Sequence, residues 1–126
     1  MRYTFSNIIL LLFAVALISA CIKVGGTGGK AEIHGHIIHD TIHIPSAFIY
    51  LKYDATEFPG TLLNVYDETT LSDTSGHYQF EALMRGDYYI YCVAYDSLTS
   101  EPVTGGLAIV IEKKKGETEA KVFVTE

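Results

Sequence analysis

Apolar and small residues recur at every second position through much of the chain after residue 30. In 33–37, 47–51 and 107–111 these alternate positions hold Ile, Leu, Ala or Gly. A period of two is typical of β-strands that bury one face, and no stretch keeps the spacing of an amphipathic helix. The pattern therefore predicts an all-β domain.

Short turn sequences separate the predicted strands. They are FPGT at 58–61, DTSG at 73–76, MRGD at 84–87, TGG at 104–106 and KKGE at 114–117. Gly, Pro, Asp and Ser are the residues that tight turns favour. About seven strands at this spacing predict a small antiparallel β-sandwich that occupies residues 31–126.

The N-terminus has a different pattern. An apolar run of eleven residues, 8–18, precedes Ser19, Ala20 and Cys21. A membrane-spanning helix needs about 20 residues, so we interpret 1–20 as a secretory signal peptide. The residues Ile18-Ser19-Ala20-Cys21 resemble the lipobox of bacterial lipoproteins, which implies a lipidated Cys21 at the mature N-terminus and a location at the bacterial cell envelope. An ordinary signal peptide with a chance cysteine is the alternative.

Four glycines follow the cysteine, and they lie within residues 21–30. Glycine-rich segments behave as flexible coils, and acyl chains on Cys21 would hold the chain at a membrane surface. We therefore predict that 21–30 is a lipidated cysteine followed by a flexible tether.

Acidic residues outnumber basic ones. The whole chain has a net charge of −6, and removal of 1–20 leaves eight basic against fifteen acidic residues, a net charge of −7. Such a chain is expected to be repelled by nucleic acid and by anionic lipid headgroups, so no nucleic-acid partner is predicted. If Cys21 carries lipid, Cys92 is the remaining thiol, and we expect it to be a small core residue.

Residues 72–96 read SDTSGHYQFEALMRGDYYIYCVAYD. An Asp-x-x-Gly turn is followed by spaced aromatic residues, a leucine, a glycine turn and a Tyr-x-Ile strand; the positions are Asp73, Gly76, Tyr78, Phe80, Leu83, Gly86, Tyr88 and Ile90. This pattern resembles the signature of carboxypeptidase regulatory-like domains, which are transthyretin-like sandwiches. The resemblance implies that fold for 31–126 and a non-enzymatic accessory role.

The residues of this signature have structural explanations. Asp73 is expected to accept hydrogen bonds from amides of its own turn, and Gly76 and Gly86 to occupy positions with positive φ. Seven residues of this segment are expected to fill the space between the two sheets, namely Tyr78, Phe80, Leu83, Tyr88, Ile90, Cys92 and Ala94.

Histidines gather in the sequence HGHIIHDTIH at 34–43. A His-x-His pair on a strand places both imidazoles on one face, so His34 and His36 could hold zinc or copper if His39 supplied a third ligand. The alternative is that these histidines are solvated edge and loop residues.

Tyrosines are expected on the outer face of the strand that contains Tyr88 and Ile90. If those two residues face the core, Tyr89, Tyr91 and Tyr95 face outward together. Exposed aromatic residues often mark contact surfaces, and tyrosine can stack on sugar rings. The alternative is that the segment 97–104 covers this face.

No nucleophile elbow, carboxylate pair or phosphate-binding loop is recognisable, so no catalytic residue and no enzymatic activity are predicted. The sequence favours a lipid-anchored binding or scaffolding module of the bacterial envelope, with an envelope protein or a glycan as partner. Metal binding through the histidines and carbohydrate binding through the tyrosines are the alternative functions.

Overall fold

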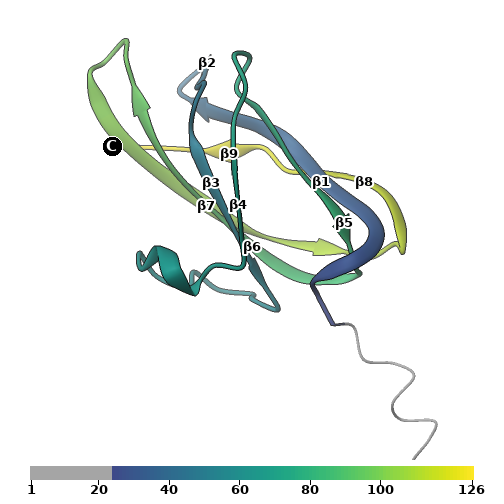
Figure 1. Cartoon of the computed structure of the whole chain (residues 1–126). Helices are drawn as coiled ribbons and strands as arrows, with labels where there is room; N and C mark the ends of the chain where they lie inside the picture. Colours follow the sequence, from purple (N-terminus) through teal and green to yellow (C-terminus); the bar gives the residue numbers. More distant parts are fainter. Residues whose placement is uncertain (1–23) are drawn as a thin grey trace, which may run out of the picture.

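Two β-sheets form a sandwich in the computed structural model, which describes residues 24–126 (Figure 1). The strands are β1 (Thr27–His39), β2 (Ile42–His43), β3 (Phe48–Tyr53), β4 (Glu68–Leu71), β5 (His77–Leu83), β6 (Gly86–Asp96), β7 (Glu101–Ile111), β8 (Lys115–Glu119) and β9 (Val122–Phe123). The helical part of these residues is one 3-10 turn, η2 (Leu63–Val65). The predicted all-β sandwich is confirmed.

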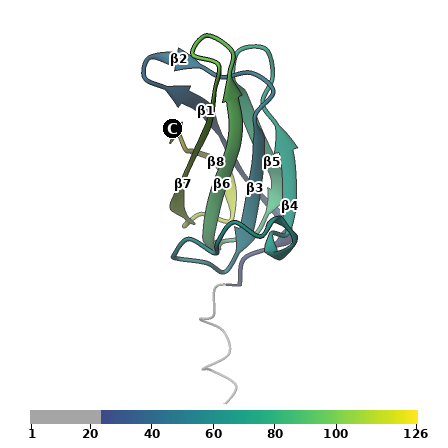
Figure 2. The same ribbon diagram turned by 90° about the vertical axis from the view of Figure 1, so that its left-hand side faces the viewer.

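The strand β1 organises one of the sheets. It pairs antiparallel with β2 and β5, and parallel with β8 and β9. The other sheet has the order β4-β3-β6-β7 and is antiparallel throughout. The parallel pairs arise because β7 ends at the end of the sandwich where β1 begins, so β8 starts there and runs in the same direction as β1 (Figure 2).

The core lies between the sheets and follows the predicted alternation. Tyr88, Ile90 and Cys92 on β6 are fully buried, and Phe80 on β5 packs with them in one cluster. Burial raises the pKa of the Cys92 thiol to about 12, which fits an inert core residue. The predicted inward face of these two strands is confirmed.

The DTSG turn between β4 and β5 forms as expected. The Asp73 side chain accepts hydrogen bonds from the Ser75 amide at 2.8 Å and from the His77 amide at 3.0 Å, and Gly76 has a φ of 77°. The expectation for Gly86 is wrong, because Gly86 is not among the residues with positive φ. A Cβ there would lie 2.7 Å from the Gly25 nitrogen, so Gly86 is needed for close packing.

The predicted tether is too long at its C-terminal side. Residues from Thr27 onward belong to β1, and Gly25 and Gly26 are buried. The Gly26 amide donates to the Tyr88 hydroxyl at 2.8 Å, and a Cβ on Gly29 would lie 2.1 Å from the Leu83 carbonyl oxygen. Glycines 25, 26 and 29 therefore serve packing, whereas Cys21 and the predicted signal peptide lie outside the described residues.

The predicted turn at 104–106 is also wrong. Gly105 and Gly106 lie inside β7, which runs without interruption alongside β6. A Cβ on Gly105 would meet the Phe123 carbonyl oxygen at 2.2 Å, and one on Gly106 would meet the Ile90 carbonyl oxygen at 2.5 Å and the Tyr89 ring at 2.9 Å. Here glycine indicates a close approach to a strand and not a change of chain direction.

Gly35 offers a direct test of this packing. A Cβ on Gly35 would lie 1.8 Å from the Ala120 carbonyl oxygen, so Gly35→Ala must push the 120–125 segment away from β1. We expect the variant to lose about 1–3 kcal/mol of unfolding free energy or more, measured by urea denaturation. Unchanged stability would contradict this close crossing.

Candidate functional site

The outer face of the four-stranded sheet carries the predicted tyrosines. Tyr89, Tyr91 and Tyr95 alternate with the buried residues of β6, as expected. Their exposures differ, because Tyr95 is 58% exposed and Tyr91 only 8%. The prediction that Tyr91 is an exposed contact residue is therefore wrong.

The β3–β4 connection, residues 54–67, covers Tyr91. The Tyr66 ring stacks on the Tyr91 ring with centroids 5.8 Å apart, and the Phe58 ring lies 5.1 Å from it. Burial raises the pKa of Tyr66 to about 12, and its hydroxyl donates to the Gly60 carbonyl at 2.8 Å. The cover thus comes from 54–67 and not from the segment 97–104, which the sequence suggested as the alternative.

A shallow groove remains beside this cover. It has a volume of about 240 Å³ and is lined by Phe58, Tyr89, Tyr91, Thr104, Gly105 and Gly106. Phe58 is 49% exposed, and its ring lies 5.8 Å from that of Tyr89. We call these six residues the aromatic groove. Its small volume can admit one flat ring against the rings that border it.

Sequence reasoning did not single out Phe58, because it lies in a turn far from β6 in sequence. The one feature of the sequence that could have pointed to Phe58 is that a large aromatic residue stands beside the Pro-Gly pair of a predicted turn.

Tyr95 lies apart from the aromatic groove, beside the β6–β7 turn.

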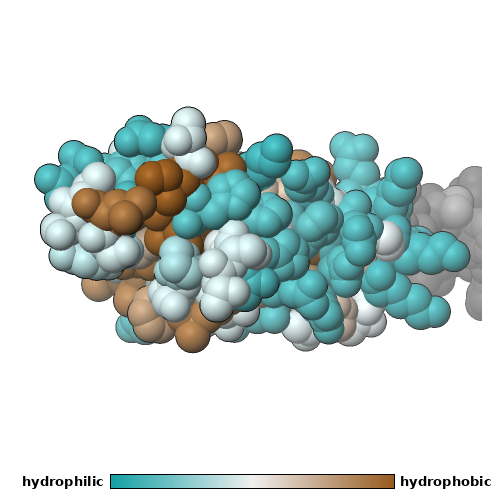
Figure 3. Space-filling model, turned by 90° about the horizontal axis from the view of Figure 1, so that it is seen from above, coloured by the Kyte–Doolittle hydropathy of each residue, from teal (hydrophilic) through white to brown (hydrophobic). Residues whose placement is uncertain are grey.

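Seen from above, the surface of the molecule is mostly hydrophilic, and its hydrophobic side chains gather at the left, away from the grey residues (Figure 3). The exposed apolar residues of the turns at this end of the sandwich include Ile42 and Leu98. The three predicted tyrosines therefore do not form one contact surface.

Four histidines meet on the outer face of the other sheet. The ring of His36 lies 4.7 Å from that of His43 and 5.3 Å from that of His77, and His34 lies 5.8 Å from His77. His77 was missed because it comes from β5, outside the histidine-rich sequence. Burial lowers the pKa of His36, and the neighbouring His43 and His77 lower it further.

The predicted ligand set of His34, His36 and His39 is not brought together. Strand alternation places His39 on the inner face of β1, where it is buried. Within residues 24–126, no group of three or more His, Cys, Asp or Glu side chains is arranged to hold a metal ion. The inclusion of His39 in a joint metal site is therefore wrong.

His39 instead pairs with Asp96. The two side chains are buried, with His39 Nδ1 2.6 Å from Asp96 Oδ2. The other Asp96 oxygen accepts hydrogen bonds from the amides of Leu98 and Thr99, so the pair joins the end of β1 to the β6–β7 turn. This hydrogen bond raises the pKa of His39 above its usual value and lowers that of Asp96.

These shifts predict a pH-dependent contribution to stability. The raised pKa of His39 means that its contribution is complete below about pH 6.5 and is lost as the pH rises through the folded-state pKa. The lowered pKa of Asp96 means that its contribution is lost only in acid, as the pH falls below about 4. We expect His39→Gln to lower the melting temperature more at about pH 5.5 than at about pH 8.5.

The control is His43→Gln, which removes an exposed imidazole that takes part in no ion pair within the described residues, so its effect on the melting temperature should be the same at both pH values. A His39→Gln penalty that is the same at both pH values would contradict the ion pair.

Comparison with known proteins supports the fold. No protein-family model and no curated protein matches the chain. Among solved structures, the chain is similar to BcpA, the major pilin subunit of Bacillus cereus, with 14% sequence identity and a TM-score of 0.53. The match covers 78% of this chain and 30% of that one, so this chain spans about a third of its length. At this identity, the likeness shows the β-sandwich fold alone.

The described residues were also compared with the length and hydropathy that a membrane-spanning helix needs. In residues 24–126, no helix is long and apolar enough to cross a bilayer.

Proposed function

We propose that this chain is a lipid-anchored, non-enzymatic binding module of the bacterial cell envelope, and that it contacts its partner through the aromatic groove. The observation that carries the proposal is the groove itself, where the partly exposed rings of Phe58 and Tyr89 border the strand glycines. Aromatic rings supply large contact areas at low entropic cost, which favours binding.

A glycan is the second candidate for the partner, beside an envelope protein. The groove is small and shallow, so it can hold one flat ring against Tyr89 and Phe58. A sugar ring or a single protruding side chain of a protein has a suitable size.

The envelope location is supported by the sequence around Cys21. The eleven-residue apolar run and the small residues before the cysteine match a lipoprotein signal peptide. The pilin subunit named above has a similar fold, and a sandwich of this kind suits a structural or adhesive role.

The anchor is tested by metabolic labelling with a palmitate analogue. We expect label on the wild type and on Cys92→Ser, which changes the buried thiol, but none on Cys21→Ser. Label on the Cys21→Ser variant would contradict the anchor.

The aromatic groove is tested with the double variant Phe58→Ser and Tyr89→Ser. We expect it to lose about tenfold or more in affinity for a glycan on an array or for a purified envelope protein, because two stacking rings are removed. Tyr95→Ser is the matched control, because it removes an exposed tyrosine of the same strand outside the groove. Equal binding by the double variant and the wild type, with both folded, would refute the groove as the contact site.

A further inference from the structure

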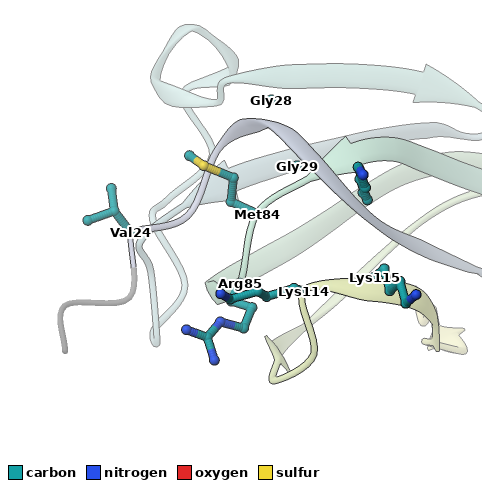
Figure 4. A pocket seen from close by; sticks show the side chains of 8 residues that line it. Val24, Gly28, Gly29, Met84, Arg85, Lys114 and Lys115 are labelled. Carbon is teal, nitrogen blue, oxygen red and sulfur yellow. The ribbon is translucent and has the colours of Figure 1, made fainter. Parts of the chain in front are cut away.

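A pocket lies at the end of the sandwich where the described chain begins. It has a volume of about 660 Å³ and is lined by Val24, Gly28, Gly29, Lys30, Met84, Arg85, Lys114 and Lys115 (Figure 4). These residues come from the segment before β1, the start of β1, the β5–β6 turn, the β7–β8 turn and the first residue of β8. We call them the basic pocket.

Half of the residues that line this pocket are cations. Residues 24–126 contain seven Lys and Arg and fifteen Asp and Glu, and four of the seven cations line the basic pocket. No acidic residue is among the described residues that line it, although Asp87 and Glu112 are close in sequence. Folding therefore concentrates positive charge at one end of an acidic protein.

These four cations also lack acidic partners. None of them takes part in an ion pair within the described residues. Lys30 and Lys115 are direct neighbours across the parallel β1–β8 pair. Like charges opposite one another destabilise a sheet, so an anion between them would relieve a repulsion that the fold itself leaves in place.

Apolar side chains border the same cations. Val24 is 54% exposed, and Met84 lies above Arg85 in Figure 4. The β3–β4 connection lies at this same end in both ribbon views (Figures 1 and 2), and it exposes Leu62, Leu63 and Val65. Cations next to exposed apolar residues are the composition of surfaces that lie in a lipid interface.

We propose that the basic pocket binds the phosphate headgroups of anionic phospholipids, so that this end of the sandwich rests on the membrane surface. The proposal rests in part on the lipid anchor of the proposed function. Cys21 is only three residues before Val24, so a lipid on Cys21 would place the pocket beside the membrane. Its volume lies within the usual range for pockets that hold small molecules.

The net negative charge of the chain does not oppose this contact. At physiological ionic strength, charges farther apart than about 8 Å are largely screened. The membrane therefore responds mainly to the nearest charges, and these include the four cations of the basic pocket. The sequence-based expectation of repulsion from anionic headgroups holds for the chain as a whole and not for this end.

The test uses a chain that starts at Ile22, so that no lipid is attached. The core cluster extends from Ala31 to Val124, so this shortened chain keeps the whole folding unit. Its binding is measured by co-sedimentation with vesicles of phosphatidylglycerol and phosphatidylcholine, and with vesicles of phosphatidylcholine alone. We expect binding to the anionic vesicles only, and a loss of that binding as salt is raised.

Two exposed lysines give a matched pair of variants. Lys114→Glu reverses a charge in the basic pocket and should weaken binding to anionic vesicles about tenfold or more, whereas Lys121→Glu, between β8 and β9, should change it less than about twofold. Equal losses for the two variants, or equal binding to both kinds of vesicle, would overturn the proposal.

Competition identifies the source of the anion. Inorganic phosphate or a soluble anionic polysaccharide at the same anion concentration should displace little protein from the vesicles. Full displacement by either would overturn the membrane assignment in favour of a free phosphate or an anionic glycan. Because this chain lacks Cys21, its failure to bind vesicles would leave the labelling result for the anchor unaffected, and the reverse also holds.

Discussion

The crossing of the C-terminal segment over β1 is the contact on which the rest of the sandwich depends. The Ala120 carbonyl oxygen occupies the space that a side chain at Gly35 would need, and it accepts a hydrogen bond from the Tyr78 hydroxyl at 2.6 Å. The Ala120 amide donates to the His34 carbonyl at 2.7 Å. Because both polar groups of Ala120 are used, the chain can pass close to β1 without an unsatisfied backbone group.

The same segment then joins the two sheets. Val124 donates from its amide to the Ile38 carbonyl on β1, and Thr125 exchanges two hydrogen bonds of 2.9 Å with Thr104 on β7. The edge between β1 and β7 is thereby closed, and Gly105 lets the Phe123 backbone approach. Closing an edge removes free backbone groups that could pair with another chain. The aromatic groove lies beside this junction, because Thr104 and Gly105 also line it.

Sequence periodicity predicted the parts of the fold that depend on neighbouring residues. The inward set of β5 and β6 and the Asp73 turn were predicted correctly, because alternation and turn chemistry are local. The roles of Gly29, Gly86 and Gly105 were not predicted, because each depends on the backbone of a segment that is distant in sequence.

The aromatic neighbours of His36 and Tyr91 were missed for the same reason, because His77 and Phe58 come from other elements. The basic pocket gathers Lys30, Arg85 and Lys114 from three separate segments, so the order of residues along the chain does not show that they lie together.

The packing of Gly25 and Gly26 would limit how far the module stands from a membrane if Cys21 carries lipid. The Gly25 amide donates to the Asp54 side chain at 2.7 Å and the Gly26 amide to the Tyr88 hydroxyl, so the folded unit begins four residues after Cys21. Four extended residues span at most about 14 Å. With lipid on Cys21, such a short connection would keep the basic pocket within reach of the headgroups and would prevent the sandwich from extending far from the bilayer. The aromatic groove lies on a side face of the sandwich, on the outer side of the four-stranded sheet. If the proposed anchor holds, a partner of the groove would have to approach along the membrane and not from far above it.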